Sequence, residues 1–316
     1  MRIAVIGAGA VGGAIAARLA GSGHEVEVTA RGAHLAAVRA GGIHLRGKWG
    51  SIDAAVTAAE RLSQAPRLAI VTTKAQDAAA ALRENAAHLD GVPILVIQNG
   101  LEGIAVARRE LPSSRVSGGL AMFAASYLSP GEITITAPGP TFIGGDNAAF
   151  VASVLGQAIA VDVVTDFAGA QWSKLVVNQV NALPAITGLS AQQTIAMPHL
   201  RRLLVESMRE TVRVGLASGV HFASVSGLSH ALLRAFAAAP YWIAQLVPRL
   251  MGRRMGEVPN PGSTLQSIKR GQLTEIDYLN GAVVTAGAAV GVPTPVNARF
   301  VALVHEVERI GEFVAL

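Results

Sequence analysis

The chain has 316 residues, of which 51% are hydrophobic, 4% aromatic and 15% charged, and its net charge is +5. This length predicts two domains, each large enough to bury a core of its own. The lysine and arginine residues are scattered, and few aromatic side chains are available to stack on bases, so we expect no nucleic-acid partner. A mildly basic surface suits small anions equally well.

The N-terminus, Met1-Arg2 followed by small and apolar residues, superficially resembles a signal peptide. The three glycines at positions 7, 9 and 12, for which a signal peptide has no need, and the charge of Arg18 argue against one. No apolar stretch reaches the roughly 18 residues of a spanning helix without a break, so we expect no membrane association. The sequence contains no cysteine, which excludes a disulfide scaffold. We therefore predict a cytoplasmic protein.

The first predicted strand, residues 3–6, leads into the loop Gly7-Ala8-Gly9-Ala10-Val11-Gly12 and then into a helix over 14–20. In this order the first glycine permits a tight turn, the second lets the backbone approach a pyrophosphate, and the third permits close helix–strand packing. The N-terminus of the helix favours an anion. The pattern predicts that the six loop residues bind a dinucleotide.

The second predicted strand, 25–29, is followed by Arg31. An NAD-binding protein usually has an acid here, about 20 residues beyond the loop, which binds the ribose 2′-hydroxyl. An arginine can pair instead with a 2′-phosphate, so the sequence predicts NADP (NADPH) as the cofactor and reductive chemistry. The alternative is a solvated loop arginine.

Further strands are predicted at 68–71, at 94–97 and from Val116, with helices between them, for example over 75–85. Lys74 follows the strand at 68–71 and is expected either near the same end of the cofactor or simply at a helix start. Asn99, in a turn after the next strand, is expected to hold the nicotinamide ribose or amide. The alternation predicts parallel βαβ units in an α/β, doubly wound, Rossmann-type sheet.

The pattern changes near residue 132. Residues 133–136 and 141–144 predict a pair of strands joined by the turn 137–140. The helical period then dominates, with helices predicted at 171–184, 199–218, 225–238, 264–270 and 275–290. We therefore expect an NADP-binding Rossmann domain of residues 1–167 and an all-helical substrate and catalytic domain of residues 168–316. Because open α/β sheets bind ligands at the carboxyl ends of their strands, catalytic groups from both domains are expected to converge there.

Lys174, Asn178 and Asn181 are spaced i, i+4 and i+7, so they share one face of the predicted helix at 171–184. That face is either solvated or a buried polar stripe. The rest of the helix is apolar, which favours burial: Leu175, Val176, Val177 and Val180. Burying a lysine is costly, and desolvation lowers its pKa toward the range in which it delivers a proton. We predict that Lys174 is a general acid.

Two later patterns are typical of helix starts. Ser263 opens the capping-box pattern Ser-Thr-Leu-Gln, and Glu275 lies in the segment Thr-Glu-Ile-Asp over 274–277. Capping, with a favourable helix dipole for Glu275, would account for both residues. From these residues alone, Ser263 and Glu275 either cap helices or belong to the functional site, and both alternatives stay open.

Taken in order, these features resemble the ketopantoate reductase family over almost the whole chain. The segments that carry the resemblance are the glycine loop, Arg31, Lys74, Gln98-Asn99-Gly100, Lys174-x-x-x-Asn178, Ser263, the run 274–281 and Gly291-Val292-Pro293-Thr294-Pro295. The resemblance implies NADPH-dependent reduction of 2-dehydropantoate, a small 2-oxo acid, to pantoate, a step toward coenzyme A.

The resemblance also implies roles for single residues. Lys174 would be the proton donor, and Asn178 and Ser263 would hold the substrate. Arg31 and Lys74 would hold the 2′-phosphate, Asn99 would contact the cofactor, and Glu275 would lie beside cofactor and substrate.

Two features depart from the family. A second substrate asparagine, often four residues after the first, would fall on Ala182; this chain has Asn181 instead. The segment 238–259, with Tyr241, Trp242 and three arginines, is longer than we expect in a compact member of the family. Its apolar run suggests a membrane surface, but Pro240 and Pro248 interrupt it, so packing at a domain or subunit contact, including that of a homodimer, is favoured. A family enzyme acting on another 2-oxo acid is therefore an alternative.

Three other classes are weighed against the family. A β-hydroxyacid dehydrogenase shares the Lys-x-x-x-Asn helix but lacks the Thr-Glu-Ile-Asp segment. A lactate-type enzyme requires a positioned His–Asp pair, and none of the eight histidines stands at a credible site position. A non-catalytic NADPH-binding sensor is disfavoured by Lys174 and Glu275. The sequence has no HExxH motif, and we predict no metal site.

Overall fold

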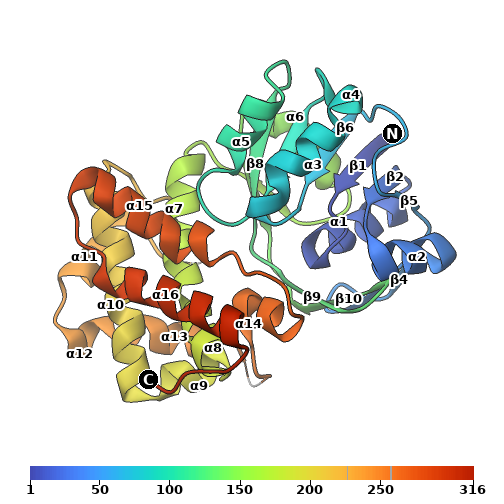
Figure 1. Cartoon of the computed structure of the whole chain (residues 1–316). Helices are drawn as coiled ribbons and strands as arrows, with labels where there is room; N and C mark the ends of the chain where they lie inside the picture. The colour runs from blue at the N-terminus through green and yellow to red at the C-terminus, as the bar shows by residue number, and fades with distance from the viewer. Residues whose placement is uncertain (226, 257) are drawn as a thin grey trace. The chain divides into compact units, whose positions relative to one another are not determined.

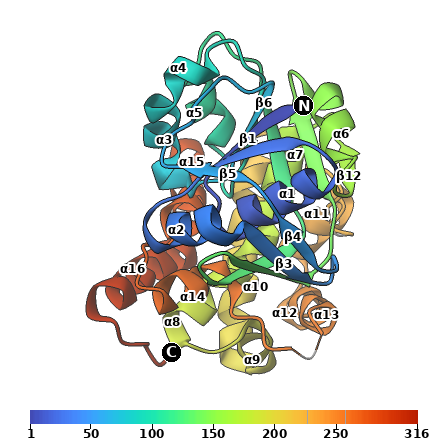
Figure 2. The same cartoon turned by 90° about the vertical axis from the view of Figure 1, so that its right-hand side faces the viewer.

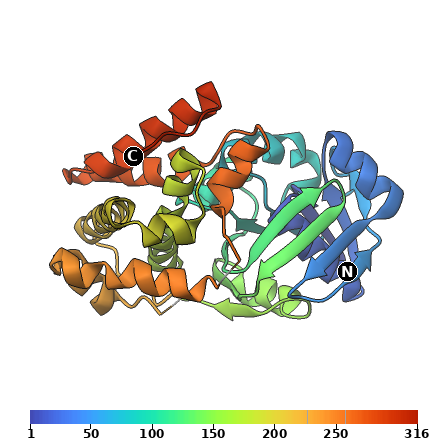
Figure 3. The ribbon, with the colours of Figure 1, turned by 90° about the horizontal axis from the view of Figure 1, so that it is seen from below.

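The computed structural model describes residues 1–225, 227–256 and 258–316. The chain forms two compact units, Met1–Phe167 and Ala168–Leu316 (Figure 1). Figures 2 and 3 show the elements of each unit from two further directions. Ser226 in the predicted helix 225–238, and Glu257 in the segment 238–259, lie outside the described residues.

The first unit contains an eight-stranded sheet in the order β12-β11-β8-β7-β6-β1-β2-β5. Its strands are β1 (Arg2–Ile6), β2 (Glu25–Thr29), β5 (Thr57–Ala59), β6 (Leu68–Val71), β7 (Ile94–Ile97), β8 (Val116–Ala121), β11 (Thr141–Gly145) and β12 (Val161–Val163). Six neighbouring strands, in the order β8-β7-β6-β1-β2-β5, are parallel, and β11 runs antiparallel to β8. The order of these six strands is that of a Rossmann fold, which confirms the predicted fold class.

Helices cover both faces of this sheet. They are α1 (Ala10–Gly21), α2 (Gly32–Gly41), η1 (Ala75–Asp77), α3 (Ala78–Glu84), α4 (Ala86–Leu89), α5 (Gly103–Glu110) and α6 (Ala148–Leu155). In β1, Ile3 and Val5 face one hydrophobic core, which α1 shares, whereas Ala4 and Ile6 face another, which contains Leu82 of α3. Alternate residues of a strand point to opposite faces, so a strand covered on both sides is apolar throughout.

A second sheet, in the order β4-β3-β10-β9, packs on the other side of α1 (Figure 2). Its strands are β3 (Ile43–Gly47), β4 (Ile52–Ala54), β9 (Ala124–Ser129) and β10 (Glu132–Ala137). The predicted pairing of residues 133–136 with 141–144 is wrong. Both strands exist, but β10 pairs with β9 and β3, whereas β11 pairs with β8 and β12. The segment 137–140 therefore leads from one sheet to the other.

The second unit is helical throughout its described residues, apart from one isolated bridge. Its elements are α7 (Phe167–Asn178, which starts at the last residue of the first unit), η2 (Gln179–Asn181), α8 (Ala182–Thr187), α9 (Ala191–Ala196), α10 (Pro198–Ala217), α11 (His230–Ala238), α12 (Tyr241–Ala244), α13 (Leu246–Arg254), α14 (Gly262–Lys269), η3 (Ile276–Tyr278), α15 (Asn280–Val290) and α16 (Pro295–Ile310). The long helix α10 packs against α9, α11, α15 and α16.

The segment 238–259 forms two short helices, α12 and α13. Pro240 is the N-cap of α12, and Pro248 lies in the first turn of α13, where a helix tolerates proline. Trp242 is 67% exposed and Leu250 is 52% exposed. In the described part of the chain, no helix combines the length and the apolar character that crossing a bilayer requires.

Candidate active site

The glycine loop is held by threonines at the ends of β2 and β6, the two strands that flank β1 in the sheet. The backbone N–H of Gly7 donates to Thr29 Oγ1 at 3.0 Å, and the N–H of Ala8 donates to the Thr29 carbonyl at 2.9 Å. On the other side, Thr72 Oγ1 donates to the Gly7 carbonyl at 2.7 Å. Consecutive peptide planes of the loop are therefore fixed from both β2 and β6.

Each glycine of the loop meets a different environment. Gly7 has φ +97, and a Cβ there would lie 2.8 Å from the backbone N of Thr73. A Cβ at Gly12 would overlap the Gly7 carbonyl oxygen and Thr72 Oγ1. A Cβ at Gly9, the N-cap of α1, would meet nothing within 4 Å. The loop is thus closed where it packs on the protein and open at the helix N-terminus, as a bound pyrophosphate requires.

The other candidates of the first unit follow three parallel strands of the large sheet, in which β6 and β7 are neighbours and β1 separates β6 from β2. Arg31 comes after β2, Lys74 after β6 and Asn99 after β7, so all three lie at the carboxyl edge of the sheet with the loop. Arg31 is the N-cap of α2, its side chain is 69% exposed, and its Nη2 lies 3.1 Å from Glu84 Oε2 of α3. Lys74 and Asn99 are partly buried, and Lys74 is the N-cap of η1.

Gln98 links the two strand ends that carry Lys74 and Asn99. Its Nε2 donates to the Thr73 carbonyl at 2.8 Å, and the residue is 9% exposed. This buried amide fixes the separation of the loops after β6 and β7. From the sequence, Gln98 had no role of its own beyond its place in the segment Gln98-Asn99-Gly100.

In the second unit, the helix predicted over 171–184 is interrupted. The α-helix α7 ends at Asn178, a single 3-10 turn carries Asn181, and α8 follows. Lys174 and Asn178 still share a face at i and i+4. Residues three apart in a 3-10 helix eclipse one another, so Asn181 remains on the side of Asn178. Ala182 is fully buried.

Lys174 is partly buried on a helix whose neighbouring side chains are almost inaccessible. Val176 is 0% exposed and Leu175 is 1% exposed. Desolvation lowers the pKa of the Lys174 ammonium from 10.5 to about 8, against the charge of Glu275, which raises it. At neutral pH the group therefore keeps its proton but holds it less tightly than a solvated lysine does.

Ser263 follows a residue that packs against Asn181, and Ser263 does not cap its helix. The N-cap of α14 is Pro261 and it makes no side-chain capping bond, so the predicted capping box is wrong. A Cβ at Gly262, which has φ +70, would lie 2.5 Å from Oδ1 of Asn181. Asn181 therefore packs against the residue that precedes Ser263. The Ser263 residue is exposed, so capping does not explain its hydroxyl.

Glu275 is partly buried at the start of η3. Its carbonyl accepts hydrogen bonds from the N–H groups of Tyr278 and Leu279, and Thr274 Oγ1 accepts from the N–H of Ile276. Here Thr274, rather than Glu275, makes the turn-forming side-chain bond. The Glu275 carboxylate influences Lys174 through its charge.

A buried polar network positions the two segments that carry Asn181 and Glu275. The Asn280 amide donates to Gln179 Oε1 at 2.7 Å and to Asn297 Oδ1 at 2.9 Å, and these three residues are fully buried. Glu210 accepts from the N–H groups of Val296 and Asn297 at the N-terminus of α16. This network was not predicted from the sequence. Gln179 lies between Asn178 and Val180, so the sequence around it gave little signal of its burial.

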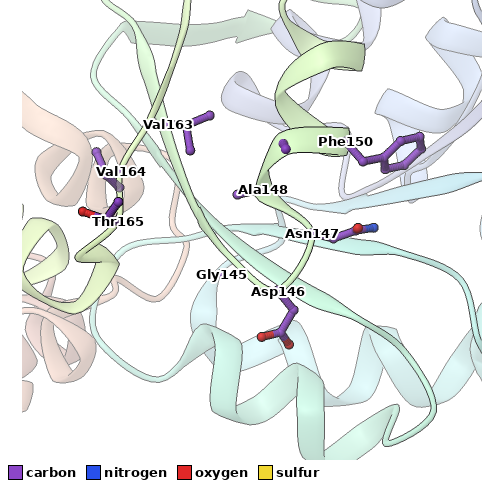
Figure 4. A pocket seen from close by; sticks show the side chains of 9 residues that line it. Gly145, Asp146, Asn147, Ala148, Phe150, Val163, Val164 and Thr165 are labelled. Atoms are coloured by element: carbon purple, nitrogen blue, oxygen red, sulfur yellow. The ribbon is translucent and has the colours of Figure 1, made fainter.

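Other features of the described residues contribute no chemistry to the site. They include no cluster of three or more potential metal ligands. The pairs His44–Asp53 and His305–Asp277 are largely solvent-exposed. An open hollow of about 510 Å³, which Figure 4 shows, contains none of the candidate residues and lies at the β11–β12 edge of the large sheet.

A Rossmann-ordered sheet with an open glycine loop, and a helical unit with a desolvated lysine, are the parts of a nucleotide-dependent oxidoreductase. Residues 3–147 match the family model described as "Ketopantoate reductase PanE/ApbA", and residues 166–308 match the model of its C-terminal part. The chain belongs to the ketopantoate reductase family. It is an oxidoreductase that acts on a CH–OH group.

Individual relatives agree with this assignment. A 2-dehydropantoate 2-reductase of Pyrococcus horikoshii is 28% identical over 98% of this chain and 99% of its own. The crystal structure of a PanE/ApbA family ketopantoate reductase from Ralstonia eutropha JMP134 has a TM-score of 0.84 and 29% identity, covering 98% of this chain and 99% of that one. D-mandelate dehydrogenase with NADH and anilino(oxo)acetate has a TM-score of 0.81 at 19% identity, also covering 98% and 99%, a likeness of fold alone.

Proposed function

We propose that this enzyme uses NADPH to reduce 2-dehydropantoate to pantoate, in the cytoplasmic route to coenzyme A. Relatives named for this activity match along nearly their whole length. The observation that carries the proposal is the desolvated Lys174, whose charge interacts with Glu275 and which shares a helix face with Asn178. A lysine that is easily deprotonated suits the reduction of a ketone, in which the new alkoxide requires a proton.

The first unit supplies the cofactor residues of this proposal. The loop from Gly7 to Gly12 takes the pyrophosphate, and its fit rests on the open space at Gly9. Arg31 and Lys74 take the 2′-phosphate, for which Arg31 exchanges its exposed partner Glu84. Such a surface pair is worth little, so a phosphate displaces the carboxylate at small cost. Asn99 contacts the nicotinamide end. When bound, NADPH supplies the hydride for C2 of the oxo acid.

The second unit supplies the acid and the substrate contacts. Lys174 stabilises the developing negative charge on the ketone oxygen and then donates its proton to that oxygen. Asn178, Asn181 and Ser263 orient the carboxylate and hydroxyl of the substrate, which lowers the entropic part of the barrier. Glu275 keeps Lys174 protonated, because its charge raises the pKa of that amine.

One observation favours a second candidate within the family, a different small 2-oxo acid. Ala182 is fully buried and has no amide, so the asparagine nearest that position is Asn181 in a 3-10 turn. The side-chain amide that would contact the substrate is thus attached one residue earlier in the chain, at Asn181. A shift of this size suits another arrangement of substrate hydroxyls.

The test measures NADPH oxidation with ketopantoate and with a panel of 2-oxo acids. We expect the wild type to turn over ketopantoate. In Lys174→Ala the turnover rate should fall by a factor of 100 or more, since general acid catalysis contributes about 10²–10⁴-fold. Lys269→Ala, at an exposed lysine of α14, is the matched control and should stay active. Turnover of another oxo acid but not of ketopantoate would select the second candidate. NADPH binding without any turnover would refute both.

A further inference from the structure

The glycine loop has a third anchor, His34, in the first turn of α2. Its Nε2 lies 2.7 Å from the Ala8 carbonyl oxygen. Its Nδ1 accepts a hydrogen bond of 3.1 Å from the backbone N–H of Gly131, in the turn from β9 to β10. The ring also meets Tyr127 edge-on, with centroids 4.8 Å apart. One side chain therefore connects the loop to the second sheet of the same unit.

These two hydrogen bonds define the protonation of the ring. The N–H of Gly131 can only donate, so Nδ1 is the acceptor and carries no proton. The proton of the neutral ring is then on Nε2, which donates it to the Ala8 carbonyl. Burial lowers the pKa of His34, which favours the same neutral form.

The bond to Ala8 also determines the direction of the next amide. A peptide unit is planar and trans, so the N–H of Gly9 points opposite to the Ala8 carbonyl and away from His34. Gly9 is the N-cap of α1, where the first helical N–H groups have no partner inside the helix. Thr29 and Thr72 fix the two preceding peptide units, and the Ala8–Gly9 unit depends on His34.

We propose that His34 is a positioning residue for the dinucleotide, which holds the Ala8–Gly9 peptide so that the amides at the start of α1 face the pyrophosphate. This role rests on the proposed function of the loop. It gives His34 an effect on cofactor affinity and no part in proton transfer.

Two substitutions separate the two bonds of the ring. In His34→Gln the amide nitrogen can take the place of Nε2 and still donate to Ala8. In His34→Asn the shorter side chain reaches the place of Nδ1, so the contact to Gly131 survives and the bond to Ala8 is lost. His88→Asn, at another partly buried histidine of the first unit, is the control.

The measurements are dissociation constants for NADPH and for adenosine 2′-monophosphate, which has no pyrophosphate. Amide hydrogen exchange over residues 8–12 is measured in the ligand-free protein. We expect His34→Asn to weaken NADPH about tenfold, the effect of one lost hydrogen bond. The same variant should bind adenosine 2′-monophosphate normally and exchange the loop amides faster. His34→Gln should resemble the wild type in all three measurements.

Equal NADPH affinity in the Asn variant and the wild type, with unchanged exchange, would overturn the inference and leave the proposed function intact. Equal weakening of both ligands in both variants would also overturn it, because the role would then be general folding. A wild type that binds no dinucleotide would instead refute the proposed function. In that case the exchange measurement still decides whether His34 holds the loop.

Discussion

The side-chain amide of Asn280 donates a hydrogen bond of 2.7 Å to Oε1 of Gln179, which joins the start of α15 to the 3-10 turn η2. Both residues are 0% exposed. The turn carries Asn181, and the segment just before α15 carries Glu275. This single bond therefore links the two parts of the second unit that carry proposed substrate and acid-positioning residues.

We expect Asn280→Ala to destabilise the protein by about 2–3 kcal/mol, because buried partners of the amide lose a hydrogen bond without gaining water. The KM for the oxo acid should rise while the dissociation constant for NADPH stays unchanged. Urea unfolding and steady-state kinetics measure the two effects. Asn147→Ala, which removes a side chain that makes no capping bond in α6, is the control. A change confined to NADPH binding would contradict this account.

The loop glycines give a paired prediction. Gly9→Ala should fold with an unchanged melting temperature, since φ at Gly9 is −68 and the new methyl group meets no protein atom within 4 Å. It should nevertheless weaken dinucleotide binding, because the methyl group occupies the space of the pyrophosphate. Gly12→Ala should lower the melting temperature, since its Cβ overlaps the Gly7 carbonyl oxygen and Thr72 Oγ1. Calorimetry with and without NADPH distinguishes these outcomes.

Much of the first unit follows from local sequence patterns. The strands β2, β6 and β7 have the predicted bounds, because each is a short strand-forming run between turn residues. β6 and β7 are apolar throughout, and β2 alternates valine with polar residues. The pairing of β10 was not predictable in this way. The turn at 137–140 looks like a hairpin connection, yet Gly139 packs against the Met122 carbonyl and the chain crosses to another sheet. Partners far apart in sequence decide such pairings.

The second unit was less predictable, because its polar residues look alike in sequence whether buried or exposed. Gln179 and Asn280 are interior groups whose partners come from distant helices. Helix α16 was missed because its start, Thr294-Pro295, has the appearance of a loop, although proline is favoured in the first turn of a helix. The predicted capping box at Ser263 was wrong, since Pro261 is the N-cap of that helix, which begins at Gly262. The structure has a capping box elsewhere, at the start of α9, where Ser190 and Gln193 form it.

The Arg31–Glu84 pair predicts opposite effects of its two partners. Arg31→Ala should reduce the preference for NADPH over NADH at least tenfold, because it removes a charge-assisted contact worth about 1.5–3 kcal/mol. Glu84→Ala should tighten NADPH binding about two- to threefold, since it frees Arg31 from an exposed ion pair worth less than about 1 kcal/mol. Arg83→Ala, the neighbouring exposed arginine, which pairs with Glu110, is the control. If NADH serves as well as NADPH in the wild type, Arg31 does not select the cofactor.

The pKa of Lys174 sets the expected pH dependence of reduction. Lys174 must be protonated to donate, so kcat/KM for the oxo acid should fall as pH rises through about 8. Glu275→Gln removes the charge that raises this pKa, so the falling limb should move to lower pH. Normalised pH–rate profiles of the two proteins test both statements. If the falling limb lies at the same pH in the wild type and in Glu275→Gln, the charge of Glu275 does not raise the pKa of Lys174.

Lys174→Met should abolish turnover and yet stabilise the fold. The unfolded chain, with a pKa of 10.5, holds the proton to higher pH than the folded chain, with a pKa of about 8. The unfolded state therefore binds more protons between these values, and stability rises with pH across this window. Below pH 8 the folded state carries the full cost of the desolvated charge, which corresponds to about 3 kcal/mol.

Because Lys174 is only partly buried, we expect a smaller gain of about 1–2 kcal/mol for Lys174→Met at pH 7. The gain should shrink as pH approaches 10.5, where the wild-type penalty disappears. Urea unfolding at pH 7 and pH 10 measures it, and Lys269→Met, at an exposed lysine, should show neither effect. Equal stability of Lys174→Met and the wild type at both pH values would show that the desolvation of Lys174 costs the fold nothing.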